Sequence, residues 1–197
     1  MARRADHTRE ELHRMALDAA RDIVEIDGLR GIKARRIMDD IGYTVGTLYQ
    51  LFDDLDDLIV HMNTETLDAL HETCSSVSLA SEPEESLRGL AEGYVRYTSE
   101  NPRLWSALFE HQLPEGKEMP EWYDARVVQL LALVEKAIAP FFHEGEESER
   151  LHESRLLWAS LYGITSLESA NKIGKHDSAA AMVDSLIEIH LTSLQNR

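Results

Sequence analysis

Basic side chains are concentrated near the start of the chain, where they could contact the phosphates of a nucleic acid. Lys33, Arg35 and Arg36 lie within four residues of one another. Arg3, Arg4 and Arg9 precede them. Lys and Arg bind phosphate oxygens through charge-assisted hydrogen bonds, and such contacts supply much of the affinity of DNA-binding proteins. The question is then which elements would carry these cations to a duplex.

The cations lie in a pattern of two short helices joined by a tight turn. Residues 34–41 have apolar side chains at a helical spacing, and Gly42 interrupts the pattern as a glycine beyond a helix C-terminus does. Thr44 is predicted to be the N-cap of a second helix over residues 45–52. Two helices joined by about four residues including glycine indicate a helix-turn-helix, whose second helix enters the major groove of DNA.

The net charge of -16 argues against a protein that is basic throughout. The first 52 residues contain 9 of the 20 Lys and Arg and 9 of the 36 Asp and Glu, so this end is neutral. The remaining 11 basic and 27 acidic residues give the rest of the chain the whole negative charge. An acidic body is repelled by DNA, which would leave only the N-terminal end against the duplex. A plain solvated surface explains the same acidity.

Helical patterns continue along the whole chain, and no alternating strand pattern of useful length is found. We predict an all-α fold of about nine helices. It would comprise a three-helix DNA-binding domain over residues 1–55 and a helical effector-binding and dimerisation domain over residues 56–197, with the boundary near the start of a long helix. Besides the two short helices, the predicted helices cover residues 8–27, 55–74, 81–100, 102–112, 121–142, 151–172 and 177–194, with a loop at 75–81.

The last two predicted helices are apolar on more than one face, which indicates burial from more than one side. Two such helices meeting their copies about a two-fold axis would form a four-helix bundle between subunits. We therefore expect a homodimer, while burial within a single subunit remains the alternative. The predicted interface residues are Leu157, Ile164, Leu167, Val183, Ile187, His190 and Leu194.

Aromatic and polar side chains in the C-terminal part could line a pocket for a small molecule. Plain core packing explains any single one of them equally well. As a group they favour an apolar or aromatic effector. The candidate ligand-binding residues are Tyr94, Tyr97, Trp105, Phe109, His111, Trp122, Tyr123, Trp158 and Tyr162.

The sequence carries no signature of an enzyme, a metal site or a membrane span. The single Cys74 excludes an intrachain disulfide, and no metalloprotease, phosphate-loop or nucleophile-elbow motif occurs. No run of 18 apolar residues exists, and the N-terminus lacks the apolar stretch of a secretory signal. We therefore expect a cytoplasmic protein without a cofactor, with DNA, a small effector and a second copy of itself as partners.

The run GYTVGTLYQLF at residues 42–52, preceded by ARRI at 34–37 and followed by Leu58, resembles the TetR family of bacterial transcriptional regulators. The resemblance covers residues 8–70. A second run, WASLYGITSLE at 158–168, is similar to the penultimate helix of one branch of that family. The resemblance implies a ligand-responsive regulator, with repression expected, that binds a near-palindromic operator and is released by its effector.

In this family the helix over residues 44–49 reads the DNA. Val45 and Thr47 would offer methyl groups to thymine, and Gly46 would let the backbone approach the duplex closely. Tyr49 would donate its hydroxyl to a phosphate, and Gln50 would pair with adenine. The predicted DNA-binding residues are Lys33, Arg35, Arg36, Thr44, Val45, Gly46, Thr47, Tyr49 and Gln50.

Two positions depart from the family pattern. Lys33 stands where a Thr or Ser usually caps the first helix of the motif. Leu55 stands where a Lys usually binds phosphate, inside the acidic run FDDLDDL at residues 52–58. The departure at Leu55 supports an alternative function, a helical dimer that has lost DNA binding and acts through protein contacts.

Overall fold

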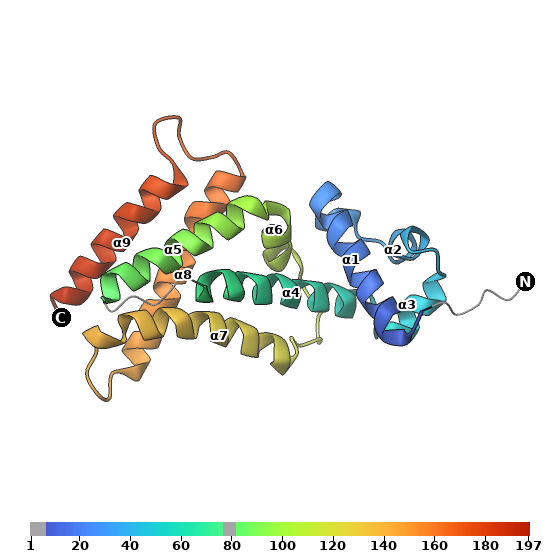
Figure 1. The fold of residues 1–197 in the computed structure, drawn as a ribbon, viewed down its shortest axis with the longest axis horizontal. Coiled ribbons are helices and arrows are strands. Elements are labelled where there is room, and N and C mark those ends of the chain that lie inside the picture. The colour runs from blue at the N-terminus through green and yellow to red at the C-terminus, as the bar shows by residue number, and fades with distance from the viewer. Residues whose placement is uncertain (1–6, 77–81) are drawn as a thin grey trace, which may run out of the picture. The chain divides into compact units, whose positions relative to one another are not determined.

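The computed structural model describes residues 7–76 and 82–197, and these residues form α-helices without any strand (Figure 1). This confirms the predicted all-α class with about nine helices. The helices are α1 (Arg9–Asp27), α2 (Ala34–Asp40), α3 (Val45–Leu51), α4 (Leu55–Ser75), α5 (Pro83–Glu100), α6 (Pro102–Glu110), α7 (Glu121–Ile138), α8 (Glu147–Ser169) and α9 (Ala179–Gln195). Short 3-10 turns cover Leu29–Gly31 and Ala139–Phe141.

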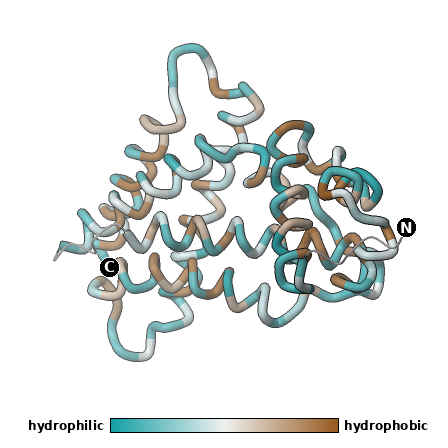
Figure 2. Tube along the Cα trace, turned by 45° about the vertical axis from the view of Figure 1, so that its right-hand side comes forward, coloured by the Kyte–Doolittle hydropathy of each residue, from teal (hydrophilic) through white to brown (hydrophobic). Residues whose placement is uncertain are grey.

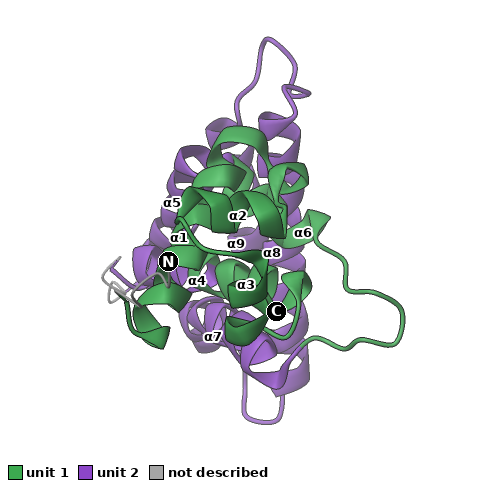
Figure 3. Cartoon of the chain, turned by 90° about the vertical axis from the view of Figure 1, so that its right-hand side faces the viewer, with its two compact units in different colours: residues 1–66, 103–119 green, residues 67–102, 120–197 purple. Residues whose placement is uncertain are grey.

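The chain divides into two compact units, each built from two separate segments (Figure 3). The first unit contains Met1–Thr66 together with Arg103–Met119, and the second contains Leu67–Pro102 together with Pro120–Arg197. The long helix α4 contributes residues to both units. The first unit therefore contains α6 and the segment after it, whereas the sequence places both of these in the C-terminal domain.

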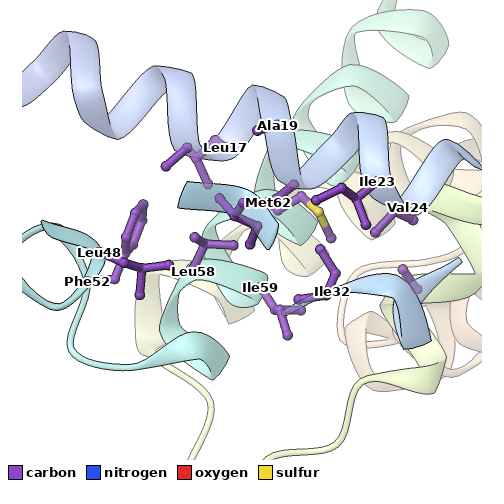
Figure 4. Close-up of a cluster of buried hydrophobic side chains, with 14 of the residues drawn as sticks. Leu17, Ala19, Ile23, Val24, Ile32, Leu48, Phe52, Leu58, Ile59 and Met62 are labelled. Carbon is purple, nitrogen blue, oxygen red and sulfur yellow. The ribbon is translucent and has the colours of Figure 1, made fainter. Parts of the chain in front are cut away.

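The core of the first unit brings together apolar side chains from α1, α2, α3, α4 and α6 (Figure 4). Leu48 of α3, Leu58 of α4 and Ile37 of α2 are fully buried there. Leu104 and Ala107 of α6 belong to the same cluster and are each 1% exposed. The two helices of the predicted motif are thus held by α1 and α4 on a shared core to which α6 also contributes.

Helix α1 begins and ends with specific backbone contacts. The Thr8 side chain accepts a hydrogen bond from the N–H of Glu11, and the Glu11 carboxylate accepts one from the N–H of Thr8, so the two residues form a capping box. The helix ends at Gly28, whose φ of 72° suits glycine. No basic residue lies in the last turn. Arg103 supplies the missing cation from α6, where its guanidinium donates to the carbonyl oxygens of Glu25 (2.9 Å) and Ile26.

The second unit is built on α5, which packs against α7, α8 and α9. Its buried side chains include Leu90 of α5, Leu157 of α8 and Ile187 of α9. Figure 2 shows hydrophobic and hydrophilic positions alternating along these helices, as expected where one face packs on neighbours and the other meets water. None of the described helices combines the length and the apolar character that crossing a membrane requires.

Several predicted helix boundaries were wrong. Helix α7 ends at Ile138 rather than at 142, because Pro140 lies in the 3-10 turn that follows. Helix α8 begins at Glu147, inside the predicted acidic loop, and ends at Ser169 rather than at 172. The acidic side chains there suit the first turn of a helix. Helix α6 stops at Glu110, two residues early, and α9 starts at Ala179, with Ser178 as its N-cap.

Two expectations concern residues for which no structure is described. The predicted loop at 75–81 includes residues 77–81, and Arg3 and Arg4 precede the first described residue. These expectations lie outside the described residues. Helix α5 has Glu82 at its N-cap position and Pro83 in its first turn.

Candidate nucleic-acid interface

The turn between α2 and α3 is a Schellman motif, which fixes how the second helix leaves the first. Gly42 has a φ of 78°. The N–H of Tyr43 donates to the carbonyl oxygen of Met38 at 2.8 Å, and the N–H of Gly42 donates to that of Asp39 at 3.2 Å. These two bonds satisfy carbonyl groups at the end of α2. The predicted role of Gly42 is confirmed by this geometry.

Helix α3 buries one face and exposes the other. Leu48 is fully buried, and Phe52, directly after the helix, is 3% exposed. On the opposite side Tyr49 is 54% exposed, and Gln50 and Gly46 are also exposed. Thr44 is exposed as well, while Val45 and Thr47 are half-buried. The solvent-exposed face of α3 therefore carries hydroxyl and amide groups and the backbone of Gly46.

Thr44 occupies the N-cap position of α3, but its side chain does not cap the helix. The Thr44 hydroxyl lies 3.2 Å from the hydroxyl of Thr47. The predicted side-chain cap is therefore wrong, because the two hydroxyls pair with each other. The N–H groups of Val45 and Gly46 consequently have no side-chain acceptor at Thr44, while the N–H of Thr47 donates to the Thr44 carbonyl oxygen at 2.9 Å.

Residues at the start of α1 contact both the turn after α2 and the end of α3. A ring nitrogen of His7 lies 2.8 Å from the hydroxyl of Tyr43. The guanidinium of Arg9 donates to the carbonyl oxygen of Gln50 at 3.2 Å. Arg9 is the first residue of α1, so this contact ties the N-terminus of α1 to the C-terminal turn of α3. The orientation of the exposed α3 face is thereby fixed by α1 and α2 together.

The three predicted cations of α2 and its N-terminus have different surroundings. Arg36 lies 2.5 Å from the carboxylate of Asp27 and is half-buried near Gly31. Arg35 is exposed and lies 3.5 Å from Asp39, four residues later, a weak surface pair. Lys33 is exposed and makes no ion pair with any of the described residues. Lys33 and Arg35 are therefore the cations most available to a phosphate.

The acidic run after α3 is more organised than its sequence indicates. The carboxylate of Asp54, the residue before α4, accepts the N–H of Asp57 at 2.8 Å. Both Asp54 oxygens also lie within 2.8 Å of the Lys117 ammonium, at 2.7 and 2.8 Å. The Lys117 hydrogen bond, followed by that from the Asp57 backbone, lowers the pKa of Asp54 below its usual value. A ring nitrogen of His111 lies 3.0 Å from the Asp56 carboxylate.

The predicted ligand-binding residues divide between the two units. Trp105, Phe109 and His111 belong to the first unit, where the two rings of Trp105 and Phe109 meet edge to face at 5.1 Å. The other six belong to the second unit, where Tyr94 and Tyr97 are buried, Tyr123, Trp158 and Tyr162 are half-buried, and Trp122 is exposed. Burial raises the pKa of the Tyr94 hydroxyl, so it stays protonated and able to donate a hydrogen bond.

The predicted interface residues lie mostly inside the protomer. Five of them, Leu157, Val183, Ile187, His190 and Leu194, are buried in the second unit and fill its own core. Ile164 is half-buried and Leu167 is 42% exposed. The exposed large apolar side chains of α8 and α9 are Leu156, Leu167 and Ile189, at 50, 42 and 69%. Of the predicted interface residues Leu167 is therefore exposed and five are buried, while Leu156 and Ile189 are exposed at positions that the sequence analysis did not choose.

Comparison with known proteins assigns the chain to a family. A family model described as the C-terminal domain of tetracyclin repressor-like proteins matches residues 87–190, more than half of the 197-residue chain. The chain belongs to the TetR family of transcriptional regulators. Proteins of the TetR family bind DNA and small-molecule ligands. The resemblance seen in residues 42–52 of the sequence is thus confirmed by the other half of the chain.

Solved structures share this TetR fold over nearly their whole length. A protein of unknown function from Rhodococcus sp. RHA1 is 15% identical, with a TM-score of 0.78 and coverage of 97% of this chain and 98% of the other. A TetR transcriptional regulator from the same organism is 17% identical, with a TM-score of 0.68 and coverage of 93% and 98%. FadR from Bacillus subtilis, in complex with stearoyl-CoA, is 13% identical, with a TM-score of 0.68 and coverage of 90% and 97%. No curated protein sequence matches the chain.

Proposed function

We propose that the protein is a homodimeric, ligand-responsive TetR repressor that binds a near-palindromic operator and releases it when an apolar or aromatic effector binds. The observation that carries the DNA-binding part is the exposed face of α3, fixed by the Schellman turn at Gly42 and by the contact from Arg9 to Gln50. A helix held in this way is preorganised to enter the major groove.

The exposed α3 residues supply both positioning and reading groups. Tyr49 donates its hydroxyl to a phosphate, and Gln50 reads an adenine edge. The methyl groups of Val45 and Thr47 contact thymine, with Gly46 allowing the backbone to approach. Lys33 and Arg35 add phosphate contacts, while Arg36 holds Asp27 and acts on DNA through the position of α2.

The dimer forms through α8 and α9, by the side chains that the protomer leaves exposed. Leu156 and Leu167 lie eleven residues apart on α8, which places them on one face. Gly163 lies between them, and a Cβ at this glycine would meet no atom within 4 Å, so nothing in the protomer covers it. Ile189 provides the exposed apolar side chain of α9. Two copies would present two α3 helices to half-sites about 34–36 Å apart.

The effector binds in the second unit, among Tyr94, Tyr97, Tyr123, Trp158 and Tyr162. FadR from Bacillus subtilis shares the fold and holds stearoyl-CoA, a ligand with a long apolar chain. This supports an apolar effector for the present chain. Trp105, Phe109 and His111 belong to the DNA-binding unit, so we assign their side chains to that unit's packing. Binding of the effector favours a dimer whose α3 helices no longer match the groove.

Selection of genomic DNA fragments by the purified protein tests the proposal. The wild-type protein should enrich a near-palindromic sequence at low salt. Tyr49→Phe and Thr47→Ala should bind that sequence on the order of tenfold more weakly, since each loses a hydrogen bond to DNA. Ser99→Ala, which removes a hydroxyl from the exposed surface of α5 in the second unit, is the matched control and should bind like the wild type. Enrichment of no sequence by the wild-type protein would refute DNA binding.

A further inference from the structure

A segment distant in sequence lies against the acidic start of α4, which we define as Asp53, Asp54, Asp56 and Asp57. Lys117 is 63 residues from Asp54 but holds both oxygens of its carboxylate, at 2.7 and 2.8 Å. His111, from the same segment, lies 3.0 Å from Asp56. Both partners belong to the first unit with α3. The segment after α6 therefore brings the Lys117 ammonium and the His111 ring to the start of α4, where the charged residues nearby in sequence are all acidic.

The acidic start of α4 lies close to the part of the chain proposed to enter DNA. Asp54 follows Gln50 by four residues, which limits the separation of their Cα atoms to about 14 Å. A reading helix in the major groove, which is about 12 Å wide, has phosphate strands on both sides. Screening at physiological salt acts over about 8 Å. An unpaired carboxylate at Asp54 would therefore repel any phosphate beside α3 that comes within about this distance.

We propose that Lys117 is a positioning residue for DNA binding, which neutralises the Asp54 carboxylate so that the phosphate strand can approach the start of α4. This inference rests on the proposed function. Lys117 acts through Asp54 and does not itself hold a phosphate, because its ammonium is already placed between the two carboxylate oxygens. Both side chains are partly exposed, at 37% and 47%, but the ammonium lies at hydrogen-bonding distance from both carboxylate oxygens, in agreement with the lowered pKa of Asp54 and the raised pKa of Lys117.

The same contact has a second consequence for the geometry of the site. Asp54 also accepts the N–H of Asp57 at 2.8 Å, and the Asp57 carboxylate accepts the N–H of Asp53 at 3.0 Å. The residue paired with Lys117 is thus the one that caps the first turn of α4. The pair with Lys117 offsets the charge of Asp54 while leaving its cap of the first turn of α4 in place, and asparagine at this position could make the same cap.

The test is a double-mutant cycle on the operator duplex that the wild-type protein selects, with affinities measured at several salt concentrations. Lys117→Ala should weaken binding roughly tenfold at low salt, since each protomer then exposes an uncompensated carboxylate beside phosphates. Asp54→Asn alone should strengthen binding at low salt by up to about tenfold, because the Lys117 ammonium then lies unpaired near the same phosphates. The double variant Asp54→Asn, Lys117→Ala should regain affinity to within about threefold of the wild type. Lys136→Ala, on the exposed surface of α7, is the matched control.

Three outcomes overturn the inference. Unchanged operator affinity in Lys117→Ala would show that the pair does not matter for DNA binding. A double variant as weak as Lys117→Ala, with the salt slope reduced by about one, would show that Lys117 contacts a phosphate itself. A Lys117→Ala protein with lowered helicity by circular dichroism would assign the loss of affinity to folding. Each outcome requires that the wild-type protein binds its operator, so failure of the proposed function is recognised separately.

Discussion

The inclusion of α6 in the core of the first unit predicts that Leu104→Ala loosens residues far from it in sequence. Leu104 is 1% exposed and shares a buried cluster with Leu58, Ile59 and Met62 of α4 and with residues of α1 to α3. Truncation of a fully buried leucine to alanine costs about 3 kcal/mol, from the lost apolar contacts and the cavity left behind. A change of this size corresponds to roughly a hundredfold increase in the population of the opened unit.

Hydrogen exchange followed by mass spectrometry measures this change segment by segment. Protection should fall by about two orders of magnitude in peptides from α1 and α4 of the first unit, if exchange there proceeds through opening of that unit. Leu90→Ala is the matched control, since Leu90 is 5% exposed in the second unit. It should lower protection in α5 and α8 first. Faster exchange in Leu104→Ala that is confined to α8 and α9 would refute the assignment of α6 to the first unit.

Other substitutions separate folding from function. Gly42→Ala should lower the free energy of unfolding by about 1 kcal/mol, because the φ angle of Gly42 is positive. Gly46→Ala should leave the free energy of unfolding unchanged or raised and should weaken operator binding. Urea titration measures the first effect, and DNA titration measures the second. Ile189→Asp should convert dimers to folded monomers by light scattering, whereas Ile187→Asp should unfold the second unit; a dimeric Ile189→Asp protein would move the interface elsewhere. Burial lowers the pKa of His190, so the unfolded chain binds a proton more readily than the folded chain does. The free energy of unfolding should therefore fall as the pH drops below about 6.5. Urea titration at each pH should show a shallower decline for His190→Gln.

The DNA-binding motif could be predicted from the sequence because its signals are local. Thr8 with Glu11 and Gly42 each act on backbone groups within a few residues, so the capping box and the Schellman turn follow from residue types at fixed spacing. The buried positions of α3 follow from the same periodicity. Leu48 and Phe52 are accordingly buried, whereas Tyr49 is exposed.

The sequence could not show which apolar face of α8 and α9 is buried within the chain and which is left exposed. Both helices carry more than one apolar stripe, and periodicity alone does not say which stripe fills the protomer's own core. Leu157 and Ile187 are buried in the core of the second unit, whereas Leu156 and Ile189 are exposed. The pairing of Lys117 with Asp54 was also out of reach, since 63 residues separate them and only the course of the chain after α6 brings them together. Lys117 lies between Pro114 and Pro120, a sequence context that is typical of a loop.

The cap that Arg103 places on the end of α1 has a practical meaning for engineering hybrid regulators. A hybrid that joins this DNA-reading region to another effector domain by a single crossover in α4 would leave Arg103, Leu104 and Lys117 behind. The carbonyl groups of Glu25 and Ile26 would then lack their cation, and Asp54 would lack its counter-charge. A transplant that keeps operator recognition therefore needs two grafts, Met1–Thr66 and Arg103–Met119, exchanged together as one module.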